Sequence, residues 1–148
     1  MIRLPLLCVL LAAAAACDSI PADPDGTLDK VRSERIFRAG LISSGKDRAA
    51  PSQEKRFLER VAAATGARSE LEEGAAEPLL LDLEQGELDL VIGPLAPDSP
   101  WVTRVAIIRP IGETLEPPRL VIVPIARNGE NRWIMLLERE ARAVRTGP

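Results

Sequence analysis

The chain of 148 residues contains no histidine, no tyrosine and only two cysteines. Without histidine it cannot form a Ser-His-Asp or Cys-His nucleophilic site, a His-ligated zinc site or the His-x-x-x-His motif of metalloproteases. Its formal net charge is −3, whereas a nucleic-acid-binding chain typically carries a basic patch or stripe. These shortages exclude many catalytic sites and predict that nucleic acid is not a partner.

The residues that are present do not suggest another reaction. Carboxylates and Lys30, Lys46 and Lys55 remain as candidate acids, bases or nucleophiles, but none of them stands in a motif that fixes a partner. We therefore expect that the protein is not an enzyme and that it has no cofactor and no metal site. Hydrophobic residues make up 46% and charged residues 28% of the chain, which is the composition of a globular domain.

Residues 1–16 are predicted to be a signal peptide. One cation, Arg3, precedes an unbroken apolar run from Leu4 to Ala16, and a polar stretch begins at Asp18. This is the layout of a secretory signal, and the run is shorter than the roughly 20 apolar residues that a membrane-spanning helix needs. We therefore expect export to the periplasm or cell envelope.

The signal has two candidate endings. Three small residues from Ala14 to Ala16 suit simple cleavage, but they stand directly before Cys17, and this arrangement resembles a bacterial lipobox. The resemblance implies that Cys17 becomes the lipidated first residue and anchors the protein to a membrane through acyl chains such as palmitate. A lipobox usually has Leu where this chain has Ala14. We favour the lipoprotein ending, and since Cys8 leaves with the signal, no pair of cysteines remains for a disulfide.

Residues 17–26 are predicted to be a tether, and residues 27–145 a single lobe. The tether contains two prolines, a glycine and several acidic residues without periodicity, which is typical of a linker. Its DPDG sequence lacks the further ligands of an EF-hand calcium loop. In the lobe, apolar spacing predicts strands over Arg35–Leu41, Ala67–Leu71, Leu88–Gly93, Val102–Ile108 and Leu120–Val123, and helices over Ser52–Thr65, Glu77–Gln85 and Asn131–Arg145.

Strands and helices thus alternate through most of the lobe. This order predicts an α/β fold of three layers, with a mainly parallel sheet and helices on both faces. A chain of this size can bury a core of its own.

Four segments in order resemble the extracytoplasmic solute-binding proteins of family 3, which bind amino acids for ABC importers. They are residues 26–40, 53–73, 79–111 and 120–140, of which the third, with GELDLVIG, is the most specific. The resemblance implies one lobe of a type II periplasmic binding protein. Family members have two lobes that close on the solute, but only Arg109 to Pro118 lies where the second lobe would be inserted. The chain therefore resembles the first lobe alone.

The family's binding positions are altered in this chain. Aligned without gaps, Gly93, Pro94 and Ala96 fall where amino-acid binders use backbone N–H and hydroxyl groups, and Trp101 falls where they carry an arginine for the ligand carboxylate. Pro94 has no N–H and Trp101 has no charge, and a buried carboxylate needs charge-assisted partners. The usual mode of amino-acid binding is therefore not expected, and Arg104 is the nearest alternative cation.

Candidate ligand-binding residues lie in loops after strand ends, where open α/β sheets bind ligands. They are Ser43, Ser44, Pro94, Asp98 and Trp101. Trp101 has two interpretations: an aromatic platform for an apolar or ring-bearing ligand, or a side chain that covers apolar area at the strand ends. Trp133 shares its helical spacing with Leu136 and Leu137 and is predicted to lie in the core.

Two classes of function remain open. The first is an envelope lipoprotein whose lobe binds a small-molecule solute in a transport-related role, with an ABC permease or another envelope protein as partner. The second is a protein-interaction module, or a homo-oligomer formed through the exposed cleft face of a degenerate paralogue.

Overall fold

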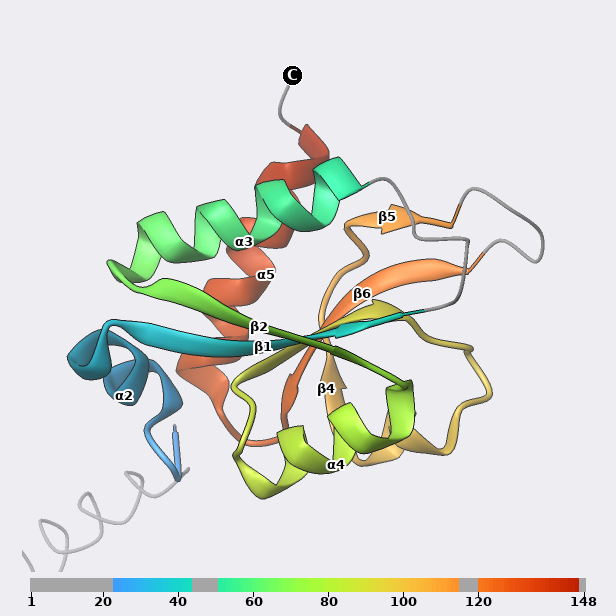
Figure 1. The fold of residues 1–148 in the computed structure, drawn as a ribbon, viewed down its shortest axis with the longest axis horizontal. Coiled ribbons are helices and arrows are strands. Elements are labelled where there is room, and N and C mark those ends of the chain that lie inside the picture. The colour runs from blue at the N-terminus through green and yellow to red at the C-terminus, as the bar shows by residue number, and fades with distance from the viewer. Residues whose placement is uncertain (1–22, 44–50, 115–119, 147–148) are drawn as a thin grey trace, which may run out of the picture.

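The computed structural model describes residues 23–43, 51–114 and 120–146. The predicted signal peptide (1–16), Cys17 and Ser44 lie outside these residues, as do residues 17–22 of the predicted tether. The described elements, labelled in Figure 1, are helices α2 (Thr27–Glu34), α3 (Pro51–Thr65), α4 (Ala76–Gln85) and α5 (Asn131–Thr146), the short 3-10 helix η2 (Pro100–Thr103), and strands β1 (Ile36–Ile42), β2 (Arg68–Gly74), β3 (Leu90–Pro94), β4 (Val105–Ile107), β5 (Gly112–Glu113) and β6 (Val121–Arg127).

The six strands form one sheet in which a single strand runs against the others. The order is β2-β1-β3-β6-β4, and β5 also pairs with β6. Strand β1 is parallel to β2 and β3, whereas β6 is antiparallel to β3, β4 and β5. Five strands therefore share one direction. The predicted α/β fold with a mainly parallel sheet and helices on both faces is confirmed.

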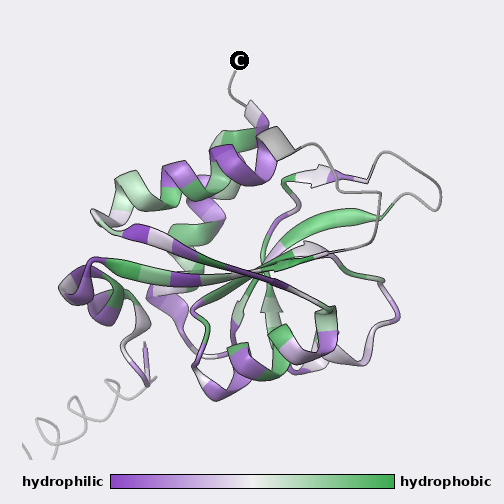
Figure 2. Cartoon of the chain, viewed as in Figure 1, coloured by the Kyte–Doolittle hydropathy of each residue, from purple (hydrophilic) through white to green (hydrophobic). Residues whose placement is uncertain are grey.

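Each face of the sheet buries its own hydrophobic core. Leu90 and Ile92 of β3 pack with α2, α3 and α5 on one face, while Val91 packs with α4 on the other. This alternation follows from the two-residue repeat of a strand. Figure 2 shows hydrophobic and hydrophilic residues alternating along the helices that cover the sheet. We name the two sides the α3 side and the α4 side.

Helix α5 is fastened to the centre of the sheet through Trp133. Its indole ring is fully buried, as the helical spacing predicts, and its Nε1–H donates a hydrogen bond of 2.7 Å to the carbonyl oxygen of Asp89. The Asp89 carboxylate accepts the backbone N–H of Arg38 at 2.9 Å, and burial raises the pKa of this carboxyl. Asp89 therefore joins α5, β1 and the start of β3.

The chain returns to the sheet through a short hairpin where a second lobe would be inserted. Thr114 N donates to Leu120 O at 2.8 Å, and Leu120 N donates to Thr114 Oγ1 at 2.8 Å. Residues 115–119 are all that lies between Thr114 and Leu120. Two hydrogen bonds therefore join the two ends of the short connection that the sequence predicts.

Three strands differ by at least three residues from the sequence prediction. The strand predicted at Ala67–Leu71 continues to Gly74. The strand predicted at Val102–Ile108 is shorter, Val105–Ile107, because helix η2 occupies Pro100–Thr103. The strand predicted at Leu120–Val123 continues to Arg127 through Pro124. Proline removes one donor from a ladder, but the Pro124 carbonyl still accepts the N–H of Ile108 at 2.9 Å, so β6 stays paired there.

The start of α2 is held against the start of α5 by a buried carboxylate. Glu130 is fully buried and accepts the backbone N–H groups of Asp25 and Thr27, each at 2.9 Å. Although burial opposes ionisation, these hydrogen bonds lower the pKa of Glu130. The predicted tether therefore meets the lobe at residues 23–26. The carboxylates of Asp23 and Glu130 lie close together there.

Asp23 is the second carboxylate at this junction. Its side chain is 6% exposed, and neither carboxylate oxygen has a hydrogen-bond partner among the described residues. Its closest cation is Arg132, at 4.0 Å. Burial, reinforced by Glu130, raises the pKa of Asp23 from 3.8 to about 6.

The raised pKa predicts a pH-dependent stability effect. Between pH 3.8 and about 6 the folded state binds more protons at Asp23 than the unfolded state does. The free energy of unfolding therefore falls as pH rises through this range, and the ionised Asp23 destabilises the fold above about 6. We expect Asp23→Asn to raise the Tm at pH 8 by about 4 °C, the shift for a change on the order of 1 kcal/mol, and to have little effect near pH 4. Thermal unfolding at both pH values measures it. The control is Asp25→Asn, because the Asp25 side chain is 57% exposed and pairs with Arg127; an equal effect of Asp23→Asn at both pH values contradicts the assignment.

Candidate functional site

The carboxyl ends of β1, β2 and β3 lie side by side at one end of the sheet, because these strands are parallel and adjacent. Ser43 follows β1 there. Its N–H and hydroxyl both donate to the carbonyl oxygen of Gly74, at 2.9 and 3.2 Å, while the residue remains exposed. The hydroxyl oxygen keeps its capacity to accept a hydrogen bond from a ligand. We name the solvent-accessible residues Ser43, Pro94 and Asp98 the strand-end surface.

A glycine lets the ends of β1 and β3 approach each other at this surface. A Cβ atom on Gly93 would lie 2.4 Å from the Cβ of Ile42, which is closer than packed atoms tolerate. Pro94 follows immediately and is half-buried. Close packing therefore fixes the backbone from which the loop after β3 begins.

The loop after β3 leaves the Asp98 side chain in solvent and buries the Trp101 side chain in the core. Asp98 is exposed, and Ser99 caps η2 by accepting the N–H of Trp101 at 3.4 Å. The Trp101 side chain is 8% exposed and belongs to the core on the α4 side, with Ile42, Leu79 and other apolar residues. The sequence leaves two interpretations of Trp101 open. Its burial favours the one in which the ring covers apolar area, and disfavours an open aromatic platform for a ligand.

Arg104 is engaged with Trp101 and with helix α4. Its guanidinium lies 4.2 Å from the centre of the Trp101 ring, a cation–π contact. The Glu84 carboxylate accepts hydrogen bonds from its Nε, at 3.1 Å, and from its Nη2. Arg104 therefore already has a carboxylate partner from the protein, on the α4 side.

The structure brings part of the predicted site together. Ser43 and Pro94 lie at neighbouring strand ends, because β1 and β3 pair with Leu41 opposite Ile92. Asp98 and Trp101 lie in the connection that follows β3, where Trp101 turns into the core. Ser44 lies outside the described residues. Ser43, Pro94 and Asp98 are thus the predicted residues that a ligand at this edge can reach.

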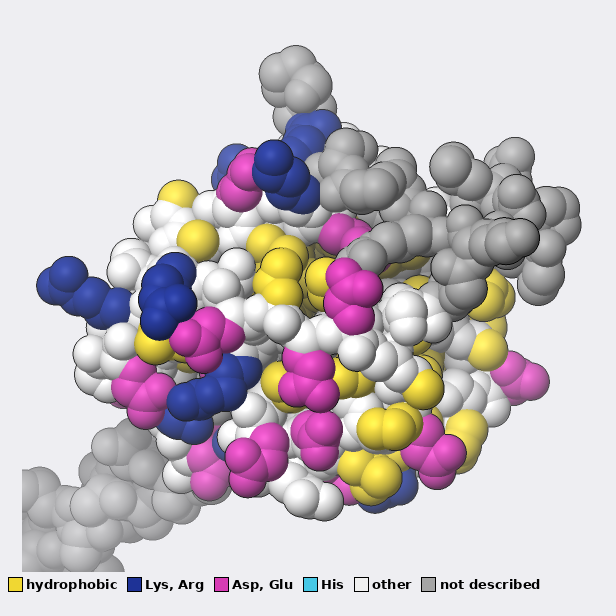
Figure 3. All heavy atoms as spheres, in the orientation of Figure 1, with side chains coloured by type: hydrophobic (Ala, Val, Ile, Leu, Met, Phe, Trp, Pro, Cys, Tyr) yellow, Lys and Arg dark blue, Asp and Glu magenta, His cyan; other side chains and the backbone are white. Residues whose placement is uncertain are grey.

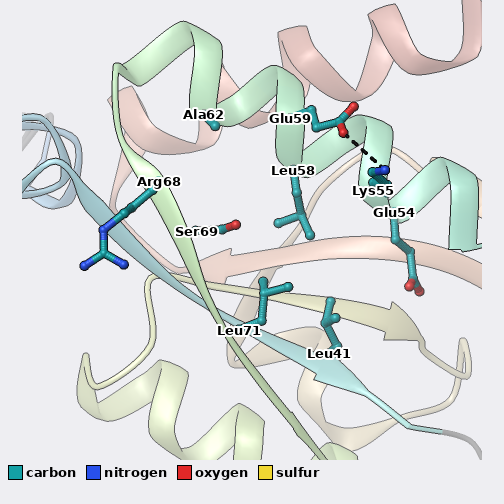
Figure 4. Close-up of a pocket in the computed structure, with 9 residues that line it drawn as sticks. All are labelled: Leu41, Glu54, Lys55, Leu58, Glu59, Ala62, Arg68, Ser69 and Leu71. Carbon is teal, nitrogen blue, oxygen red and sulfur yellow. Dashed lines mark ion pairs between the residues drawn. The ribbon is translucent and has the colours of Figure 1, made fainter.

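Sequence reasoning did not identify a groove between α3 and β2. The groove has a volume of about 570 Å³. Figure 4 shows Leu41 and Leu71 on the strands and Leu58 of α3 facing them from the opposite side. Lys55 and Glu59 form an ion pair of 3.7 Å on α3, and Leu71 is 53% exposed on β2. The sequence signal for this groove was Leu71, an apolar residue between Glu70 and Glu72. We name this hollow the α3–β2 groove.

Within residues 23–43, 51–114 and 120–146, no three cysteine or carboxylate side chains converge in a way that would hold a metal ion. Within the same ranges, no helix combines the length and the apolar character that crossing a membrane requires.

The chain resembles single lobes of amino-acid-binding proteins in structure. A mutant of domain 1 of ArgBP from T. maritima, in its arginine-bound form, matches with a TM-score of 0.66 and 12% identity over 81% of this chain and 99% of that chain. Unmutated domain 1, also arginine-bound, matches with a TM-score of 0.62 and 12% identity over 77% and 97% of the two chains. An ancestral cationic amino acid solute-binding protein matches with a TM-score of 0.63 and 9% identity over 81% and 94%.

These likenesses concern the fold. At 9–12% identity they show that the chain has the fold of one lobe of a periplasmic binding protein. None of the family models matches the chain, and none of the curated protein sequences does.

The burial of Trp101 predicts a large cost for its removal. Trp101→Ala should lower the free energy of unfolding by about 3–5 kcal/mol, as deletion of a buried aromatic side chain does. Arg104→Ala is the matched control; it removes the exposed cation over the same ring together with its ion pair to Glu84 and should cost on the order of 1 kcal/mol. Urea unfolding followed by circular dichroism measures both free energies. A cost below about 1 kcal/mol for Trp101→Ala would contradict the assignment of its ring to the core.

Proposed function

We propose that this protein is an envelope lipoprotein whose single lobe binds a small solute at the strand-end surface, in a role related to transport. Cys17 would hold it to the membrane through its acyl chains, and an ABC permease or another envelope protein would be its partner. We propose no catalytic step for it.

The observation that carries the solute-binding proposal is the match to an isolated lobe. Domain 1 of ArgBP is covered over 97–99% of its length, and its structures are of an arginine-bound form. A lone lobe of this fold therefore binds a ligand without a second lobe in the same chain. This supports ligand binding by the present lobe, in which a short β5–β6 hairpin replaces the route to a second lobe.

The side chains at the surface favour some solutes over others. Arg104 is held by Glu84, and Pro94 offers no N–H, so a ligand carboxylate would lack two of its usual partners. Ser43 supplies a hydroxyl and Asp98 an exposed carboxylate. We therefore propose a neutral or cationic solute with hydroxyl, amide or amino groups.

Association of two copies through the strand-end surface is the second candidate function. It is favoured by Val121 at the start of β6 and Val102 on η2, two apolar side chains that are each 37% exposed. Val121 lies near the end of β3, because Ile122 pairs with Pro94. Light scattering after size exclusion separates the candidates, since a monomer at micromolar concentration argues against association.

Solute binding should raise the Tm of the purified protein. A ligand at 100 times its Kd stabilises the folded state by about 2.7 kcal/mol, which corresponds to several degrees. We expect neutral or cationic compounds with hydroxyl, amide or amino groups to do so, and expect amino acids and opines, whose carboxylates lack their usual partners here, to do so less. Ser43→Ala and Asp98→Asn should reduce the shift. Ser33→Ala is the matched control, because Ser33 is also exposed and its hydroxyl also donates to a backbone carbonyl, Lys30 O, at 2.9 Å. No stabilisation by any class would refute solute binding.

Lipidation should depend on Cys17 and be independent of Cys8. In a bacterial host, Cys17→Ser should move the protein from the membrane fraction to the soluble fraction and abolish labelling with radioactive palmitate. Cys8→Ser is the matched control, because Cys8 lies within the predicted signal (1–16) and leaves with it. Unchanged membrane association and labelling of the Cys17→Ser variant would contradict the lipoprotein assignment.

A further inference from the structure

Strand β2 is an edge of the sheet with one partner among the described residues, β1. Arg68 N donates to Arg35 O at 3.0 Å, and Gly74 O accepts Ser43 N at 2.9 Å. Backbone groups alternate in direction along a strand, so the residues at odd positions between them direct their N–H and C=O groups away from β1. Ser69 and Leu71 therefore offer a ladder to a further strand.

The α3 side of this edge is apolar and hollow. Leu71 pairs with Ala39, whose side chain lies in the core on the α3 side, so Leu71 is on that side as well. Figure 4 shows Leu71 and Leu58 turned toward the α3–β2 groove, with Ala62 on the helix above. A strand added beside β2 would place every second side chain next to this groove.

The α4 side of the same edge is acidic. A second hollow, of about 320 Å³, is lined there by Arg38, Glu70, Leu71, Glu72, Asp82, Glu87 and Leu88. The arginines nearby are paired, Arg38 with Glu34 and Arg68 with Glu70. Five carboxylates (Glu34, Glu70, Glu72, Asp82 and Glu87) stand against these two cations, which leaves a net charge of −3. Figure 3 shows the acidic side chains gathered over β2 and α4 with few basic ones among them.

We propose that the outer edge of β2 binds an extended segment of another protein as an added strand, and that this segment alternates basic with apolar residues. Its backbone would pair with Ser69 and Leu71, its apolar side chains would enter the α3–β2 groove, and its Lys or Arg side chains would face Glu70 and Glu72. Strand addition to an exposed edge is a general mode of peptide recognition, in which alternate side chains give specificity. This edge lies apart from the strand-end surface.

A second copy of this chain fits the edge poorly. An antiparallel β2–β2 pair centred on Leu71 would place Glu70 opposite Glu72, and a pair centred on Glu70 would place Glu70 opposite Glu70. Like charges directly opposite each other destabilise a pair of strands. The charge pattern therefore selects a basic partner and explains how the edge avoids self-association.

The test uses a fluorescein-labelled peptide in which four Lys alternate with three Val, with the purified protein and anisotropy as readout. Two comparison peptides are the same composition in blocks, Lys followed by Val, and the alternating Glu–Val peptide. We expect the alternating Lys–Val peptide to bind at least fivefold more tightly than either. Amide hydrogen exchange should show that this peptide protects Ser69 and Leu71.

Matched variants separate the groove from general charge. Leu71→Lys should weaken binding at least fivefold, whereas Met135→Lys, an equal change at an apolar side chain that is 72% exposed on α5, should not. Glu70→Gln combined with Glu72→Gln should also weaken binding, with a folded circular dichroism spectrum as the check. The proposal is overturned if the alternating peptide binds no better than the block peptide, if Leu71→Lys and Met135→Lys act alike, or if Leu71 is already protected without peptide, which would mean that the chain covers its own edge.

Discussion

Strand β6 hydrogen-bonds to both β3 and β4, and the rest of the lobe depends on this antiparallel insertion. Without it, β3 would be an edge and β4 would have no neighbour. The strand contributes Ile122 and Ala126 to the core on the α3 side and Val123 and Ile125 to the core on the α4 side. It also leads into α5, whose Trp133 is bonded to Asp89 at the start of β3. One returning strand thus completes both cores.

The same strand determines what the surface offers. Because β6 returns through a short hairpin closed by Thr114 and Leu120, the carboxyl ends of β1 and β3 are left at an edge that a second lobe of this chain does not cover. The proposed binding site is therefore a surface of Ser43, Pro94 and Asp98 rather than a cleft between closing lobes. The close contact of Gly93 with Ile42 fixes part of the geometry from which its specificity would come.

Local signals in the sequence predicted most of the elements, and long-range contacts explain what they missed. Helix α3 follows the spacing of Phe57, Leu58 and Val61 and ends before Gly66, which has a positive φ of 71°. By contrast, the depth of Trp101 depends on α4, and the Glu130 carboxylate meets Thr27 across 103 residues. The α3–β2 groove depends on how far a helix reaches over an edge strand. The depth of the Trp101 ring and the shape of the groove cannot be predicted from Trp101 and Leu71 in the sequence alone.

The central claim is that a single lobe, completed by β6, binds a small solute at its strand ends. The most direct measurement is an NMR map of backbone amide shifts as the stabilising solute is added. The account predicts that the largest changes fall at Ser43, Gly93, Leu95 and Asp98, with little change along α5. Changes concentrated at residues 68–71, or spread evenly over the lobe, would contradict it.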